Sequence, residues 1–152
     1  MKFLSSICRG LASPSKKSSL KKLLSCEPCD IIFLQETLGS FELIVRTLLT
    51  IMPGWHFQAL DVADRYVGLS LRINPQTIKV TSAWGGQGFL GIDIFLAELG
   101  RNIYIMNSYA PNHSILDFLQ QLLENPPIDQ STILEGDLNF SIGHEEFWGH
   151  HS

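Results

Sequence analysis

Apolar runs of strand length recur along this chain of 152 residues, and most of them end at Gly, Pro, Asn or Asp. The runs predict strands at residues 2–8, 30–36 and 131–134 and near 55–61, 66–73, 77–83, 88–97 and 102–109. A short apolar run that ends in polar residues, such as 30–36, is typical of a buried strand whose C-terminal end delivers Gln35 and Glu36 to a surface. The chain therefore has to supply other layers that cover its sheet.

Three segments show helical spacing of apolar residues instead, at 17–25, 40–52 and 114–124. The apolar stripes predicted to face the core are Leu20, Leu23 and Leu24 in the first segment, Leu43, Ile44, Leu48 and Ile51 in the second, and Ile115, Phe118, Leu119 and Leu122 in the third. The early alternation of strands and helices indicates crossover units, and the run of strands in the middle indicates an antiparallel meander. Together they predict an α/β fold, with helices packed on a mixed sheet.

The charges are distributed unevenly along a chain whose formal net charge is −4. Residues 1–25 hold six Lys or Arg and no acid, whereas residues 102–152 hold seven Asp or Glu and no Lys or Arg. A net-acidic chain is a poor general binder of nucleic acid, because affinity comes largely from cations that neutralise phosphates. The basic cluster of Lys16, Lys17, Lys21 and Lys22 is either a local phosphate contact or a solvated helix face.

Cysteine content and hydropathy limit the compartment. Three cysteines are an odd number, which argues against a secreted disulfide scaffold and predicts a reducing, intracellular location, nuclear or cytoplasmic. No apolar run is long enough for a membrane-spanning helix, so no membrane association is predicted. The Cys26-x-x-Cys29 pair and the His144, His150 and His151 tail can be read as metal or redox sites, or as ordinary structural and tail residues.

Polar side chains follow three of the predicted strands. Glu36 ends the run at 30–36, Tyr109 ends the run at 102–109 with Asn112 three residues beyond it, and Asp137 and Asn139 follow 131–134. Functional crevices in open α/β sheets lie at strand ends, and carboxylates gathered at one end of a sheet suit Mg²⁺. Each group also has a simpler interpretation, as an acid in a solvated loop or as a turn built on Pro and Asn.

The motifs at these strand ends read F-L-Q-E-T, N-S-Y-A-P-N and E-G-D-L-N-F, in that order. Two further segments, S-I-C-R-G-L at 6–11 and V-G-L-S-L at 67–71, complete the pattern. Together they resemble the endonuclease/exonuclease/phosphatase superfamily, and most closely the endonuclease domain of plant LINE-type retrotransposons. The resemblance covers residues 5–140 and implies a partial four-layer α/β sandwich, two mixed sheets flanked by helices, with the second sheet incomplete.

The resemblance also implies roles for individual residues. Glu36 matches the metal-ligand Glu, for Mg²⁺ or Mn²⁺. Tyr109 and Asn112 match positions that contact the phosphate or stabilise the transition state. Asp137 matches the acid that positions or activates the attacking water, and Asn139 matches its partner at the phosphate. The implied activity is Mg²⁺-dependent hydrolysis of a phosphodiester, with DNA as the partner and no protein partner.

The sequence departs from the family pattern at several positions. Ile7 stands where the family has a metal- or phosphate-contacting Asn, Ser6 replaces a Trp, and Arg72 and Glu135 replace small residues. The chain also stops before the family's S-D-H-like motif, which predicts a domain truncated at its C-terminus, over 2–141, with a disordered tail at 142–152. Two functions remain open: an endonuclease-type hydrolase, or an inactive remnant that acts at most as a weak nucleic-acid- or metal-binding module.

Overall fold

The computed structural model describes residues 1–60, 68–86, 88–110, 115–124 and 131–139. The elements of the first half are β1 (Phe3–Ile7), α1 (Pro14–Cys26), β2 (Ile31–Gln35), α2 (Phe41–Ile51), β3 (His56–Leu60) and β4 (Leu69–Ile73). Those of the second half are β5 (Lys79–Gly86), β6 (Phe89–Leu96), β7 (Arg101–Tyr109), α3 (Ile115–Glu124) and β8 (Thr132–Asp137). The predicted tail at 142–152 lies outside the described residues.

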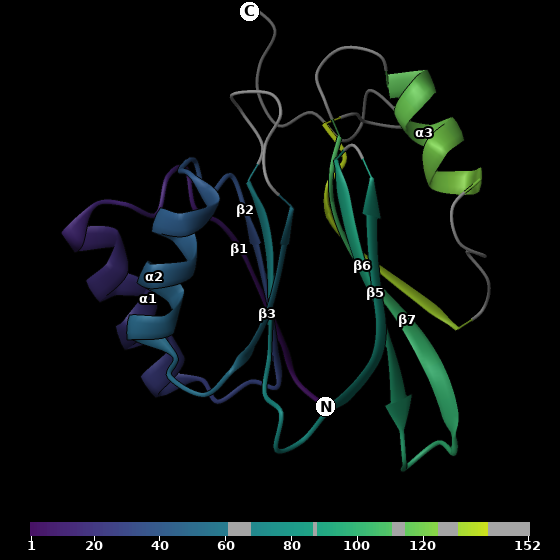
Figure 1. The fold of residues 1–152 in the computed structure, drawn as a ribbon, viewed down its shortest axis with the longest axis horizontal. Helices are drawn as coiled ribbons and strands as arrows, with labels where there is room; N and C mark the ends of the chain where they lie inside the picture. The colour runs from purple at the N-terminus through teal and green to yellow at the C-terminus, as the bar shows by residue number, and fades with distance from the viewer. Residues whose placement is uncertain (61–67, 87, 111–114, 125–130, 140–152) are drawn as a thin grey trace, which may run out of the picture.

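Two four-stranded sheets pack face to face, with helices on their outer sides (Figure 1). The first sheet has the strand order β1-β2-β4-β3 and the second has the order β5-β6-β7-β8. Each sheet is mixed, because β1 and β2 pair in parallel, as do β7 and β8, while the other pairs are antiparallel. The prediction of an α/β sandwich of two mixed sheets flanked by helices is confirmed.

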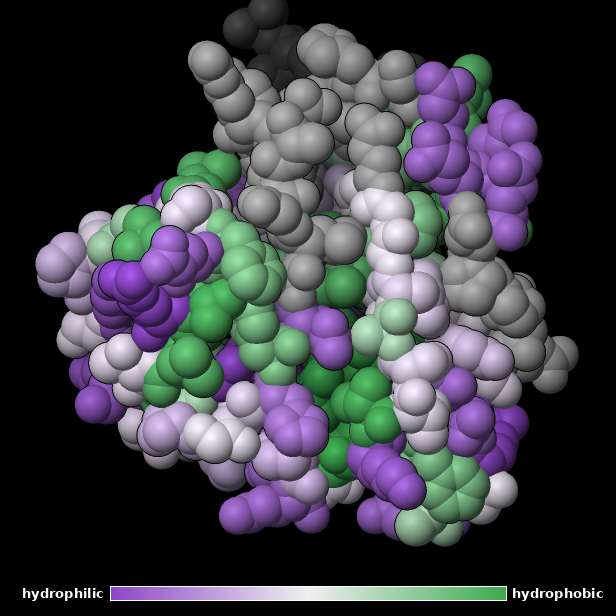
Figure 2. Space-filling view, viewed as in Figure 1, coloured by the Kyte–Doolittle hydropathy of each residue, from purple (hydrophilic) through white to green (hydrophobic). Residues whose placement is uncertain are grey.

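The core between the sheets follows from the alternation of side chains along each strand. Alternate residues of β2 and β4 point toward the second sheet, and alternate residues of β6 and β7 point back at them. The buried members of this inter-sheet core are Ile31, Phe33, Leu69, Leu71, Ile73, Ile78, Leu90, Ile92, Ile94, Ile103 and Ile105. Figure 2 shows apolar side chains gathered between the two sheets on the face that it displays.

A second core lies between the first sheet and helices α1 and α2. Ile32 and Leu34 point away from the inter-sheet core and pack with Leu20, Ile44 and Leu48. Helix α1 begins at Pro14, earlier than predicted, because the Ser13 side chain accepts a hydrogen bond from the Lys16 backbone N–H and Pro suits the first helical position.

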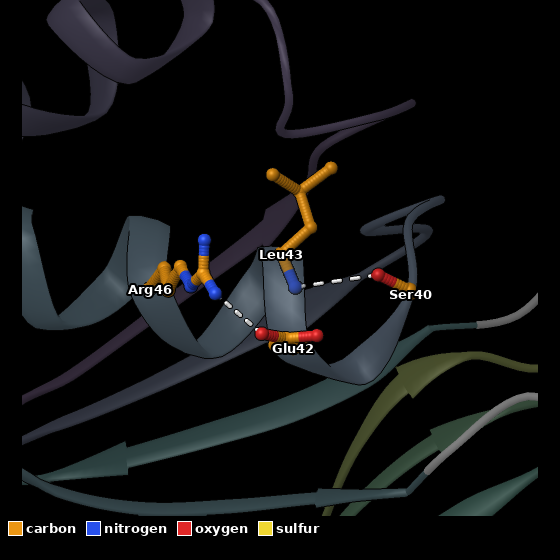
Figure 3. Close-up of polar contacts among 4 residues, drawn as sticks. All are labelled: Ser40, Glu42, Leu43 and Arg46. Atoms are coloured by element: carbon orange, nitrogen blue, oxygen red, sulfur yellow. Dashed lines mark hydrogen bonds and ion pairs between the residues drawn. The ribbon is translucent and has the colours of Figure 1, made fainter.

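Two leucines predicted to face this core are instead exposed. Leu23 is 39% exposed and Leu43 is 41% exposed, so their predicted burial is wrong. On α2 the buried face is centred on Ile44, Thr47 and Leu48, and Leu43 falls beside it because successive helical residues are rotated by about 100°. Ser40 caps the N-terminus of α2, because its hydroxyl accepts a hydrogen bond from the Leu43 N–H at 3.3 Å, close to an exposed Glu42–Arg46 ion pair (Figure 3).

Helix α3 covers part of the outer face of the second sheet (Figure 1). Phe118 and Leu122 are buried against Phe89, Met106 and Ala110, with Leu119 partly buried beside them. No helix in the described part of the chain has the length and apolar character needed to cross a membrane.

Candidate active site

The ends of four strands meet at one end of the sandwich. Because β1 pairs with β2 in parallel and β7 pairs with β8 in parallel, each pair delivers its C-terminal residues to the same edge. The final register pairs are Ile7 with Gln35 and Tyr109 with Asp137. The residues that follow β2 and end β7 and β8 therefore face one another across the gap between the sheets.

Glu36 and Tyr109 join the two sheets at this end. The Tyr109 hydroxyl donates a hydrogen bond to Glu36 Oε1 at 2.6 Å. Glu36 has a φ of 50°, a left-handed conformation that is uncommon for a residue other than glycine. Its carbonyl accepts the Gly10 N–H at 2.7 Å, so the loop after β1 holds this strained residue in place. Backbone strain of this kind often accompanies a functional side chain.

The surroundings of Tyr109 keep its phenol protonated. The pKa of Tyr109 is raised above its ordinary value, first because the phenol donates to Glu36 and then because the group is partly buried. A hydrogen bond with Asn139 opposes this shift in pKa, while the negative charges of Glu36 and Asp137 add to it. The phenol therefore acts as a hydrogen-bond donor at neutral pH.

Asp137 and Asn139 lie beside this pair. Asp137 Oδ1 accepts the Asn139 backbone N–H at 2.9 Å, which orients the carboxylate. Asn139 has a φ of 51°, and its side-chain amide donates to the Ala110 carbonyl at 2.5 Å. The structure thus brings together four of the five predicted site residues, Glu36, Tyr109, Asp137 and Asn139. The fifth, Asn112, lies outside the described residues.

A polar layer of Gln35, Asn107 and Glu135 lies directly beneath these side chains, between the sheets. Gln35 Nε2 donates to Asn107 Oδ1 at 2.8 Å and to Glu135 Oε2 at 2.9 Å. Gln35 and Asn107 are 1% and 0% exposed. This layer was not predicted from the sequence, although polar residues at inward positions of apolar strands are a signal for it.

The loop after β1 departs from the family pattern. Ile7, which has no ligand atom, ends β1 beside Gln35 and is 45% exposed. Lys16 donates to the carbonyl of Cys8 at 2.9 Å and also to that of Arg9, so this member of the basic cluster stabilises the loop.

The other residues that the sequence offers as metal or redox sites lie elsewhere. Cys26 is exposed and Cys29 is partly buried, and both are free thiols. His144, His150 and His151 lie outside the described residues.

The donor atoms at this site suit a hard cation. Glu36, Asp137 and Asn139 offer oxygen ligands, which Mg²⁺ prefers over nitrogen or sulfur. Within the described ranges, no group of three or more His, Cys, Asp or Glu side chains is arranged to hold a metal. Mg²⁺ retains several waters and is commonly held by only one or two carboxylates, so the residues present fit it better than they fit zinc.

The fold is shared with several solved structures. A humanised D. rerio TDP2 is 17% identical, with a TM-score of 0.69 over 93% of this chain and 63% of that one. The endonuclease domain of TRAS1, a telomere-specific non-LTR retrotransposon, is 14% identical, with a TM-score of 0.70 over 93% of this chain and 61% of that one. An endonuclease/exonuclease/phosphatase family protein from Bacteroides thetaiotaomicron is 12% identical, with a TM-score of 0.67 over 95% and 66%.

These likenesses define the class of fold. The chain has the fold of endonuclease/exonuclease/phosphatase proteins, and it spans about two thirds or less of the length of the three structures compared. No protein-family model matches the sequence, and neither does any curated protein.

Proposed function

We propose that this chain carries an endonuclease-type active site that hydrolyses phosphodiester bonds of DNA with the help of Mg²⁺ or Mn²⁺, and that it derives from a retrotransposon. The observation that carries the proposal is the Tyr109–Glu36 hydrogen bond, with Asp137 paired in register to Tyr109. It gathers two carboxylates and a phenol from two different sheets at one end of the sandwich.

Glu36 is the proposed metal ligand. Its Oε1 is engaged by the Tyr109 hydroxyl, which leaves Oε2 for the metal in this proposal. A bound divalent cation supplies charge neutralisation at the phosphate. The left-handed backbone of Glu36 turns its side chain out of the apolar strand that precedes it.

Asp137 is the proposed group that orients the attacking water. The Asn139 N–H fixes one carboxylate oxygen, so that Oδ2 is the atom that accepts a proton from the water. Asn139 is held in turn by its bond to the Ala110 carbonyl, and we propose that it contacts the phosphate. A positioned acid–base group of this kind contributes about 10²–10⁴-fold to a rate.

Tyr109 and Asn112 are the proposed phosphate contacts from the end of β7. The raised pKa of Tyr109 keeps its hydroxyl a donor, and a donor is what the developing negative charge on phosphate oxygens requires. Asn112, which follows Tyr109 by three positions, is proposed to bind substrate from the adjoining segment.

One structural neighbour supports DNA as the substrate, and a second supports the proposed origin. D. rerio TDP2, 18% identical to this chain with a TM-score of 0.67, has been solved with a single-stranded DNA product. TRAS1 supports a retrotransposon origin, as do the motifs at 6–11 and 67–71 of the sequence.

The test is nicking of supercoiled plasmid by the purified chain, with and without Mg²⁺. We expect nicking that requires the metal and that falls about 10²–10⁴-fold in Asp137→Ala. Glu36→Gln keeps the size of the side chain but removes its charge, so it should require much more Mg²⁺. Metal-independent nicking, or nicking that survives Asp137→Ala, would contradict the proposal.

The second candidate function is an inactive remnant that binds nucleic acid or metal weakly. It is favoured by Ile7, which places an exposed apolar side chain where the family has a polar one. Plasmid that stays intact with the wild-type chain, together with measurable binding of DNA or Mn²⁺, is the result expected for the remnant. An Ile7→Asn variant that nicks where the wild type does not would assign the inactivity to this position.

A further inference from the structure

The polar layer and the active site occupy two successive rungs of the second sheet. Asn107 pairs with Glu135 in the register of β7 and β8, and Tyr109 pairs with Asp137 two residues further along. Residues two apart on a strand point to the same face, so a member of the polar layer lies beneath each of these site residues. On the first sheet, Gln35 directly precedes Glu36.

Hydrogen bonds of the polar layer connect β7 and β8 to the first sheet across the gap. The Asn107 side-chain amide donates to the Leu34 and Ser70 carbonyls, both at 3.2 Å, and so links β7 to the first sheet. Gln35 Nε2 reaches Glu135 Oε2 at 2.9 Å, between residues that lie 100 positions apart in the chain. This bond links β8, the strand that ends at Asp137, to the strand that precedes Glu36.

We propose that Glu135 is a positioning residue, which sets the place of Asp137 relative to Glu36 by accepting the hydrogen bond from Gln35. The inference rests on the proposed function for its catalytic consequence. A hydrogen bond to a carboxylate is stronger than one between neutral groups, and Glu135 is partly buried, which limits competition from water. Because the resemblance places a small residue at this position, the link is a feature of this chain.

The NMR resonance of the Asn139 backbone amide reports the position of the Asp137 carboxylate even if the protein has no nuclease activity. Its N–H donates to Asp137 Oδ1 at 2.9 Å, so a shift of the carboxylate changes the amide resonance in a ¹H–¹⁵N spectrum. Glu135→Gln keeps an acceptor oxygen at nearly the same reach, whereas Glu135→Ala removes it. Glu98→Ala, at an exposed turn residue, is the matched control for loss of a carboxylate.

We expect the chemical shift of the Asn139 amide to change much more in Glu135→Ala than in the Glu98→Ala control. In Glu135→Gln the change should be no larger than in that control. Gln35→Leu should shift the Asn139 resonance by a similar amount to Glu135→Ala. The double variant with Gln35→Leu and Glu135→Ala should shift it little further than Gln35→Leu alone. If Glu135→Ala does not fold, Glu135→Asp, which withdraws the carboxylate by one methylene, should move the resonance in the same direction as Gln35→Leu. An unmoved resonance in the variants that fold would overturn the proposal.

The catalytic consequence is measured separately. A misplacement of about 1 Å costs roughly 10²-fold, so Glu135→Ala should lower kcat for Mg²⁺-dependent nicking by about that factor, with little change in KM, and Glu135→Gln should restore it. If the wild-type chain does not nick DNA, the proposed function fails while the amide resonance still decides the positioning role. A normal kcat in Glu135→Ala with a shifted Asn139 resonance would overturn the catalytic consequence, while the shifted resonance would still support the positioning role of Glu135.

Discussion

Two buried polar regions of this chain differ sharply in how completely their hydrogen bonds are satisfied. Between the sheets, Asn107 uses both ends of its side-chain amide: it donates to two carbonyls and accepts from Gln35. Between the first sheet and the helices, Arg72 is fully buried, yet its Nε and Nη1 have no hydrogen-bond partner among the described residues. Its Nη2 donates to the Met52 carbonyl at 2.7 Å, and its guanidinium lies 5.4 Å from the centre of the Phe57 ring.

The difference separates a polar layer whose hydrogen bonds are satisfied beside the site from a buried guanidinium that leaves two of its donors unsatisfied among the described residues. An unsatisfied buried donor costs about 1–3 kcal/mol, whereas a fully bonded network makes a buried region rigid and structurally specific. Burial lowers the pKa of Arg72 to about 10, in keeping with a charge that is poorly compensated. The polar layer lies next to Glu36 and Asp137, while Arg72 faces α2, away from the site.

The largest expected effect comes from Gly136, on which the close approach of β8 to β7 depends. A Cβ at this residue would lie 1.8 Å from the Ser108 carbonyl oxygen, and its φ is 139°. We expect Gly136→Ala to lower the free energy of unfolding by about 3–5 kcal/mol in urea titrations. Gly54→Ala is the control, because Gly54 also has a positive φ, while no atom of the described residues other than its chain neighbours lies within 4 Å of the added Cβ. Its loss should be about 1–2 kcal/mol, and equal losses would contradict the argument from close approach.

Breaking the polar layer should have the next largest effect. Asn107→Leu keeps a similar volume but removes the acceptor for Gln35 and the donors to Leu34 and Ser70. We expect a loss of about 2–3 kcal/mol, measured by urea unfolding, because buried polar groups are left without partners. A neutral result would show that the core between the sheets tolerates the loss of the Gln35–Asn107 hydrogen bond, and the contrast with Arg72 would then disappear.

Arg72 should respond in the opposite direction. Arg72→Met removes two unsatisfied donors and keeps a long side chain in the helix-side core, so we expect a gain of about 1–2 kcal/mol in the free energy of unfolding. Arg72→Lys retains the charge without the planar contact to Phe57 and should be less stable than wild type. A clear loss of stability in Arg72→Met would mean that the guanidinium contributes more than its bonds indicate.

The sequence predicts the strand-end residues well, and the links between sheets poorly. Glu36, Tyr109 and Asp137 each follow or end an apolar run, and parallel pairing alone carries such residues to a common edge. The Gln35–Glu135 bond depends on how two sheets face each other across 100 positions of sequence, which no local pattern encodes. Leu23 and Leu43 have helical spacing but lie beside the buried face, because periodicity places a stripe less exactly than packing does.

The smallest expected effect concerns Cys8, which begins the loop between β1 and α1 and contacts both regions. Its thiol packs partly against the helix-side core, and its N–H donates to the Gln35 carbonyl at 2.8 Å. Burial raises the pKa of Cys8 to about 11, the positive charge of Lys16 opposes this shift, and Glu36 adds to it. Since the thiolate is the reactive form, a pKa raised by two units lowers its population about a hundredfold at pH values below 9.

Alkylation with iodoacetamide, followed by peptide mapping, tests this expectation at one residue. The exposed Cys26 should be labelled first, and Cys8 should react about a hundredfold more slowly than an unperturbed thiol. Lys16→Met should slow the labelling of Cys8 further, because it removes the charge that favours the thiolate.

The pKa of Cys8 is raised in the folded state. The contribution of this thiol to stability is therefore complete below pH 9 and is lost as the pH rises through about 11, because ionisation then favours the unfolded chain. Labelling of Cys8 as fast as Cys26 would show that the end of β1 opens readily, and the helix-side region would then be the less rigid of the two.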